Sequence, residues 1–151
     1  MLNARDLPAG WRIAPLDNAD YALVPDLVLL LEPELSRPCL EARQQAMLAQ
    51  GWRCLGAWRD AQLAGIAGYS LRTHFFSGPV LFVENVVLLP ETRGQGIGRA
   101  LMDWLEAYAR SVGAGKVTLD AYQRNLPARR FYEALGYDPR GVHFVKDLPA
   151  D

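Results

Sequence analysis

The most regular pattern in the chain lies between residues 97 and 112, where apolar residues recur every three or four positions and charged residues occupy the opposite side. This spacing predicts an amphipathic helix. Gly113 and Gly115 follow it directly, and glycines in this place are typical of a helix end.

The segment before this helix reads as a series of strands. Residues 52–58 and 63–73 flank a short turn at 59–62, which predicts an antiparallel hairpin. Residues 79–88 are almost continuously apolar and predict a third, mostly buried strand. Residues 116–122 alternate as a strand, so strand, glycine-rich loop, helix and strand follow in the order of a parallel crossover.

Shorter elements are expected toward both ends of the chain. They are a strand at 11–15, helices at 21–31, 40–50 and 127–135, and a last strand at 142–148. Pro25 either kinks the first of these helices or marks its first turn, because proline lacks an amide donor and crowds the preceding turn. The whole pattern predicts one mixed α/β domain over residues 1–151.

Composition agrees with a single globular domain and excludes several classes. The 151 residues are half hydrophobic, with 16 basic and 17 acidic side chains and a net charge of −1, which argues against a dedicated nucleic-acid partner. Residues 1–12 lack the features of a signal peptide, and no apolar run is long enough to span a membrane. With only Cys39 and Cys54, both expected as reduced thiols, we expect a cytoplasmic protein without a membrane partner.

A glycine-rich loop at residues 93–99 joins the third strand to the long helix. Glycines let the backbone approach a ligand, and the unpaired amides and partial positive charge of a helix start favour a phosphate. The spacing fits neither the dinucleotide fingerprint nor the P-loop, because Leu101 or Arg99 stands where each pattern needs a glycine. A turn that serves only close strand-to-helix packing is the alternative.

Two motifs resemble the GCN5-related N-acetyltransferase (GNAT) superfamily. The signature Arg/Gln-x-x-Gly-x-Gly/Ala is matched by Arg93, Gly96 and Gly98. The second, Asn-x-x-Ala-x-x-Phe-Tyr-x-x-x-Gly-Phe/Tyr, is matched by Asn125, Ala128, Phe131, Tyr132, Gly136 and Tyr137. The resemblance covers about residues 81–148, and the N-terminal half matches only in the order of its elements.

The resemblance implies a fold, a donor and an acceptor. The fold is a mixed, mostly antiparallel sheet with a splayed parallel strand pair and helices on both faces. The donor is acetyl-CoA, no metal is implied, and the acceptor is a primary amine of a small molecule or peptide. The residues it assigns to CoA are Val86, Val87, Leu88, Arg93, Gly94, Gln95, Gly96, Ile97, Gly98, Arg99 and Asn125.

The same resemblance gives two catalytic candidates, Glu84 and Tyr132. An ammonium must lose its proton before the nitrogen attacks a thioester. Glu84 would accept that proton through an ordered water or merely attract the cation; otherwise it is a half-exposed strand residue. Tyr132 would protonate the leaving thiolate of CoA; otherwise it is a core aromatic. Asn125 is expected as a helix N-cap, as a pantetheine ligand, or as both.

Other conspicuous residues have weaker signals. Arginines 124, 129 and 130 either reach the 3′-phosphate end of CoA or form a solvated face. His74 and His143 have no Asp, Ser, Cys or His at a spacing typical of a catalytic or metal site. The tryptophans at 11, 52, 58 and 104 are expected in the core or hairpin, and whether one lines the acceptor cleft is open. Cys39 and Cys54 lack a neighbouring histidine, which disfavours a covalent acyl-enzyme.

Two other functions stay open beside direct acetyl transfer. One is a non-catalytic acyl-CoA-binding or regulatory module, which would not need Glu84 and Tyr132, and the other is an interaction domain that has lost its cofactor. A homodimer is compatible with the resemblance. Residues 93–130 hold seven basic side chains against three acidic ones, whereas residues 1–34 hold six acidic against two basic. This asymmetry favours a polyanionic cofactor and a cationic acceptor.

Overall fold

The computed structural model describes residues 7–150. Residues 1–6 lie outside them, including Arg5, Asp6 and the first half of the segment compared with a signal peptide. The chain forms two compact units, Met1–Leu119 and Asp120–Asp151. No helix within residues 7–150 is long and apolar enough to cross a membrane.

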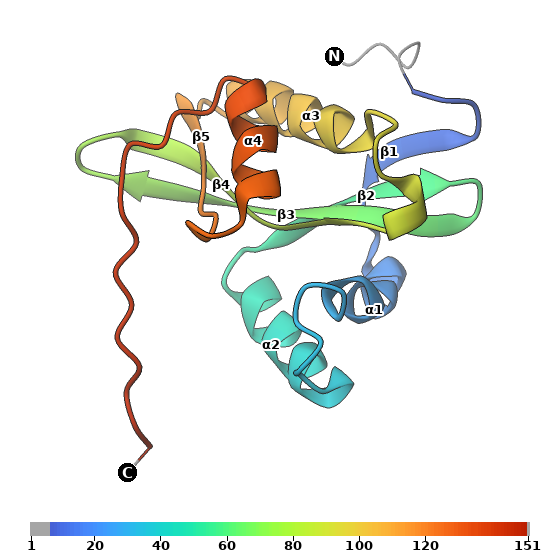
Figure 1. Ribbon diagram of the computed structural model, residues 1–151, viewed down its shortest axis with the longest axis horizontal. Coiled ribbons are helices and arrows are strands. Elements are labelled where there is room, and N and C mark those ends of the chain that lie inside the picture. The colour runs from blue at the N-terminus through green and yellow to red at the C-terminus, as the bar shows by residue number, and fades with distance from the viewer. Residues whose placement is uncertain (1–6, 151) are drawn as a thin grey trace. The chain divides into compact units, whose positions relative to one another are not determined.

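A five-stranded sheet in the order β1-β2-β3-β4-β5 forms the centre of the first unit (Figure 1). The strands are β1 (Trp11–Pro15), β2 (Arg53–Arg59), β3 (Gln62–His74), β4 (Gly78–Leu88) and β5 (Lys116–Leu119). All neighbours are antiparallel except β4 and β5, which are parallel. The structure thus confirms the mixed α/β class, the hairpin and the parallel crossover.

Helices cover both faces of this sheet (Figure 1). On one face lies α3 (Ile97–Ser111), whose Leu101, Met102 and Leu105 are fully buried. Tyr69 of β3 points to this face and packs against the rings of Trp104 and Tyr108, at 6.2 and 5.3 Å between centroids. The periodic stripe that predicted the helix is therefore the stripe that contacts the sheet.

The opposite face carries α1 (Val24–Val28) and α2 (Arg37–Ala49). Here a second apolar cluster joins the helices to the sheet; it includes Val24, Leu27, Trp52, Ile66 and Val87. Sheet side chains alternate between the two faces, so alternate positions of β3 and β4 supply this cluster and the surface beside it.

The pairing of β3 with β4 contains a β-bulge in β4. Gly68 pairs with Glu84, but Ile66 pairs with Val87, so β4 holds one more residue than β3 between these pairs. Asn85 in this extra stretch has φ 56°, a left-handed conformation that asparagine tolerates better than most residues. As a result Glu84 and Val87 share the α1/α2 face although they are three residues apart.

The helix expected at 21–31 is wrong in its extent. A 3₁₀ turn, η1 (Asn18–Leu23), comes first, and α1 then spans only Val24–Val28. Pro25 lies in the first turn of α1, where its missing amide costs nothing. The next helix begins earlier than expected, at Arg37, because the Ser36 hydroxyl accepts a hydrogen bond from the Cys39 amide and Pro38 suits the first turn.

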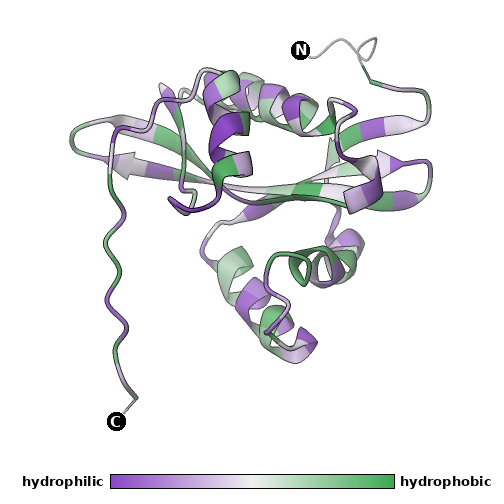
Figure 2. Ribbon diagram, in the orientation of Figure 1, coloured by the Kyte–Doolittle hydropathy of each residue, from purple (hydrophilic) through white to green (hydrophobic). Residues whose placement is uncertain are grey.

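The second unit contains one helix, α4 (Leu126–Ala134), among its described residues. The strand predicted at 116–122 stops at Leu119, and the last strand predicted at 142–148 is wrong, because no strand forms there in the described chain. Hydrophobic residues do occur along this segment (Figure 2), but Val142, Phe144, Val145 and Leu148 are exposed. An alternating pattern gives a strand only when a neighbouring strand accepts its backbone hydrogen bonds.

Candidate active site

The glycine loop at 93–99 holds its shape through left-handed backbone at Gly94 (φ 76°) and Gly96 (φ 82°), and Gly96 is the N-cap of α3. A Cβ added at either glycine would meet no atom within 4 Å. These two glycines are therefore required by backbone conformation and not by close packing, which removes the packing alternative for them. The space beside them is open to a ligand.

The start of the loop is fastened to the end of β4. Thr92 is fully buried, and its hydroxyl donates to the Leu89 carbonyl at 2.7 Å. The Arg93 guanidinium donates to the Leu88 carbonyl at 3.4 Å. Ala100 donates to the Gly96 carbonyl at 3.0 Å, as the first α-helical bond of α3. The amides of the preceding residues 97–99 are not used by the helix and suit a phosphate.

The pairing of β4 with β5 ends just before Glu84. Its pairing with β5 covers only Val80 to Val83, opposite Lys116 to Leu119. On its other edge β4 stays paired to β3, with Val87 opposite Ile66 and Leu88 opposite Gly65. The β5-facing backbone groups of residues 84–88 therefore lie outside the parallel ladder, where an extended amide chain can pair with them. The parallel strand pair that the family resemblance implies is therefore present, and its ladder ends at Val83 and Leu119.

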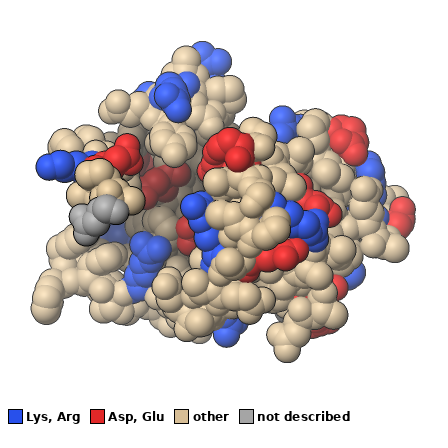
Figure 3. All heavy atoms as spheres, turned by 90° about the horizontal axis from the view of Figure 1, so that it is seen from below, with Lys and Arg blue, Asp and Glu red and all other residues tan. Residues whose placement is uncertain are grey.

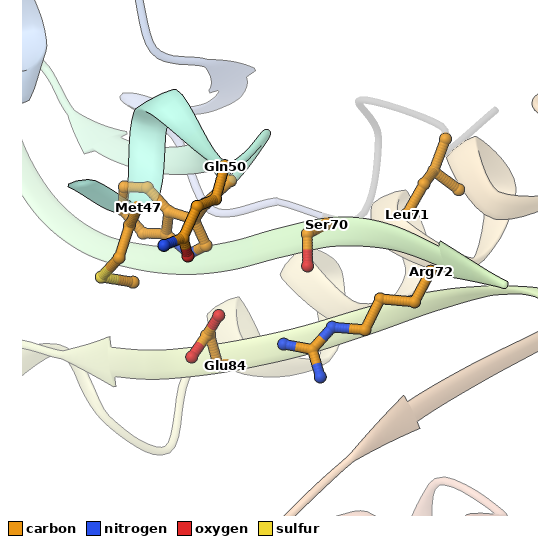
Figure 4. Close-up of a pocket in the computed structure, with 7 residues that line it drawn as sticks. Met47, Gln50, Ser70, Leu71, Arg72 and Glu84 are labelled. Atoms are coloured by element: carbon orange, nitrogen blue, oxygen red, sulfur yellow. The ribbon is translucent and has the colours of Figure 1, made fainter. Parts of the chain in front are cut away.

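A pocket of about 160 Å³ opens on the α1/α2 face of the first unit (Figure 4). Its lining comes from the end of α2, the residue before β2, and strands β3 and β4. The lining residues are Met47, Gln50, Trp52, Ser70, Leu71, Arg72 and Glu84. Of the predicted site residues, Glu84 is the one that reaches this pocket.

Glu84 is half-buried and lies directly opposite Gly68. Figure 4 shows its carboxylate on the same side of the sheet as Ser70 and Arg72, whereas Leu71 points away. The side chain of Arg72 extends back along the strand toward Glu84. The pocket thus carries a carboxylate and a guanidinium.

Tyr132 and Asn125 belong to the second unit. Asn125 is the N-cap of α4, and its side-chain oxygen accepts from the Ala128 amide at 3.2 Å, which confirms the capping role. The ring of Tyr132 meets Phe131 and Tyr137 edge-on, at 5.1 and 5.8 Å. Burial raises the pKa of the Tyr132 phenol from 10.0 to about 12, so the hydroxyl stays protonated at neutral pH.

A family model described as "Acetyltransferase (GNAT) family" matches residues 22–137. The match covers most of the chain and contains both motifs. The chain belongs to this family. As a GNAT acetyltransferase it moves an acetyl group from acetyl-CoA to an amine.

Individual relatives support the same placement. The chain is 30% identical over 147 residues to an aminoglycoside N(6′)-acetyltransferase type 1 of Stenotrophomonas maltophilia, covering 93% of this chain and 94% of the relative. It is 31% identical over 93 residues to an aminoalkylphosphonate N-acetyltransferase of Salmonella typhimurium, covering 61% and 60%. An aminoglycoside N-acetyltransferase solved with CoA has the same fold, with a TM-score of 0.81 at 22% identity over 91% of this chain and 94% of that one.

Several pocket residues of this GNAT protein were missed from the sequence, namely Met47, Gln50, Ser70, Leu71 and Arg72. Of the four tryptophans, Trp52 lines this pocket. The sequence of β3 could have indicated Ser70 and Arg72, because these polar residues alternate with apolar Tyr69 and Leu71 and so share one face of the strand. No group of three or more His, Cys, Asp or Glu side chains in the described chain is placed to hold a metal ion.

Proposed function

We propose that this GNAT enzyme acetylates a primary amine of a small molecule by direct attack within a ternary complex. The observation that carries the proposal is the position of Glu84. It lies where the β4–β5 ladder ends and also lines the pocket, so one residue borders both the expected path of the donor and a cavity for the acceptor.

The donor would be held mainly by main-chain atoms. The pyrophosphate of CoA suits the amides of the loop from Gly94 to Arg99, with charge from Arg93 and Arg99. The pantetheine amides suit the free edge of β4 from Val86 to Leu88. Asn125, already a helix cap, is proposed to bond the pantetheine arm as well.

The acceptor ammonium would first pass its proton through a water held by Glu84 to bulk solvent, because the carboxylate is too weak a base to keep that proton. The free amine nitrogen then attacks the thioester carbon, and the C–S bond breaks to leave the thiolate of CoA. Tyr132 is proposed to donate a hydrogen bond to this thiolate. Burial raises the pKa of the Tyr132 phenol to about 12, whereas a thiol has a pKa near 8.5. Full proton transfer from the phenol to the thiolate is therefore unfavourable, and the thiolate would finally take its proton from solvent.

The test measures thiol release from acetyl-CoA with a panel of amines. We expect turnover that requires an amine, and about 10²-fold lower kcat for Glu84→Gln with little change in the KM for acetyl-CoA. The matched control is Glu91→Gln, an exposed carboxylate in η2 (Pro90–Thr92). CoA binding without turnover on any amine would favour the acyl-CoA-binding module.

A cytoplasmic location and self-association also stay proposals. Cys39 and Cys54 are both free thiols, which supports a reducing compartment. Sedimentation of the purified protein over a range of concentrations would establish whether a homodimer forms.

A further inference from the structure

The polar groups of the pocket are of both signs. Glu84 supplies a carboxylate, whereas Arg72 supplies a guanidinium and Ser70 and Gln50 supply neutral donors. The surface on this side is also mixed, because Lys and Arg side chains are interspersed with Asp and Glu across the view in Figure 3. Arg37 of α2 pairs with both Asp26 and Glu41, which neutralises part of the acidic N-terminal segment. A uniformly acidic cleft for a polycation is therefore not what this face provides.

Arg72 is held in place by stacking and forms no ion pair within the described chain. Its guanidinium carbon lies 3.8 Å from the centroid of the Phe82 ring, stacked on the face of that ring. Stacking occupies the plane of the guanidinium and leaves its edge donors available. Within residues 7–150 the Arg72 side chain makes no hydrogen bond or salt bridge. A preordered, unpaired guanidinium at the rim of a pocket is suited to bind an oxyanion.

Trp52 closes the pocket beside Gly68 and the backbone of Glu84. Its side chain is 4% exposed and is held by the ring of Tyr21, at 6.1 Å between centroids. The indole nitrogen finds no hydrogen-bond partner among residues 7–150.

The spacing of the two charges sets the size of the ligand. Phe82 and Glu84 are two residues apart on one face of β4, and such side chains stand roughly 7 Å apart. Since Arg72 lies over Phe82, its guanidinium and the Glu84 carboxylate are separated by a similar distance. One small molecule with an ammonium at one end and an oxyanion a few bonds away spans this gap.

We propose that the acceptor is an amine that also carries a carboxylate, phosphate or phosphonate, with Arg72 binding this oxyanion and Glu84 facing the ammonium. The proposal rests on the proposed function, because it assigns the same pocket to the acceptor. It makes Arg72 the residue that selects an anionic amine over a neutral or polycationic one.

The experiment compares amines of similar length that differ in their second group. The probes are 2-aminoethylphosphonate and β-alanine, ethanolamine as the neutral amine and ethylenediamine as the cation. For the unmodified enzyme we expect kcat/KM to be at least about tenfold higher with one of the anionic amines. For Arg72→Gln we expect this preference to fall to near one, and for Arg72→Glu to turn toward ethylenediamine. Arg110→Gln, which removes the same charge from the last turn of α3, is the matched control and should keep the preference.

A binding measurement separates selection from general damage. By calorimetry in the presence of CoA, Arg72→Gln should weaken the binding of the better anionic amine by about 10–100-fold. Equal turnover of all probes by the unmodified enzyme, or an equal loss on every probe in Arg72→Gln, would overturn this inference while leaving acetyl transfer intact. Absence of turnover with every amine would instead overturn the proposed function.

Discussion

The indole nitrogen of Trp52 lies against the backbone of Gly68, in the space that a Cβ at position 68 would occupy. The same Cβ would also come within 2.8 Å of the Glu84 carbonyl oxygen. Gly68 therefore lets a tryptophan approach the sheet closely, next to the proposed catalytic carboxylate. This contact fixes one wall of the proposed acceptor pocket.

Replacing Gly68 by alanine should disturb the pocket more than the donor site. The added methyl group must push the Trp52 ring outward or separate β3 from β4, which we expect to cost about 1–3 kcal/mol of unfolding free energy. The KM for the acceptor should rise at least severalfold, whereas the affinity for CoA should change little. Gly115→Ala is the control, because a Cβ there meets nothing within 4 Å. Equal effects of both variants would show that the contact with Trp52 is not responsible.

Replacing Gly96 by alanine should disturb the donor site more than the pocket. A residue with a Cβ is strained at φ 82°, at a cost of about 1 kcal/mol or more. Either the stability falls by this amount or the loop rearranges and releases the amides that face the donor. We therefore expect weaker CoA binding by calorimetry, with an unchanged ratio of kcat/KM values across the amine panel. A variant with unaltered melting temperature and CoA affinity would contradict the left-handed cap.

The Tyr132→Phe variant tests the phenol without changing the shape of α4 greatly. We expect kcat to fall by about 10–100-fold, with CoA affinity nearly unchanged, because only the hydrogen bond to the leaving thiolate is lost. Because the pKa of Tyr132 is about 12 in the folded protein, no alkaline decline of kcat below about pH 11 should come from this residue.

The raised pKa of Tyr132 also predicts how stability depends on pH. The folded-state pKa lies above the unfolded value of 10.0, so burial of the neutral phenol adds stability below pH 10 that is lost as pH rises toward 12. Unfolding midpoints between pH 9 and pH 12 should show a smaller alkaline loss for Tyr132→Phe than for the unmodified protein.

The two cysteines should differ in reactivity. Cys54 is fully buried, and burial raises the pKa of its thiol to about 12. At pH 8 such a thiol is ionised in roughly one molecule in ten thousand. An alkylating reagent should modify Cys39 alone in the folded protein, and both cysteines after denaturation. Mass spectrometry of peptides reports the outcome, and rapid labelling of Cys54 in the native state would mean that the α1/α2 face opens.

The sequence predicts the parts of this GNAT protein that depend on local pattern. The long helix, the hairpin and the glycine loop all follow from neighbouring residues, and all three are confirmed. The errors lie where distant residues decide. The helix expected at 21–31 ends early after Pro25 sets a new first turn, and the strand expected at 142–148 has no ladder within the described chain.

The acceptor pocket could be predicted only in part for the same reason. Glu84 was found because the family resemblance points to this position within a predicted strand, but its neighbours come from α2 and β3, which no spacing in the sequence brings together. Arg72 lacks a motif of its own. The proposed role of Arg72 follows from its stacking on Phe82 and from the position of Glu84 on the same face of the sheet.

The extra residue at the bulge of β4 has a consequence for how such sequences diverge. If the same residues formed a regular strand without the bulge, Glu84 and Val87, three positions apart, would point to opposite faces of the sheet. One choice removes the carboxylate from the pocket, and the other removes a core side chain. Substitutions around the pocket can therefore accumulate and change the preferred amine, whereas a change that flattens the bulge while keeping all of its residues is incompatible with activity or with folding.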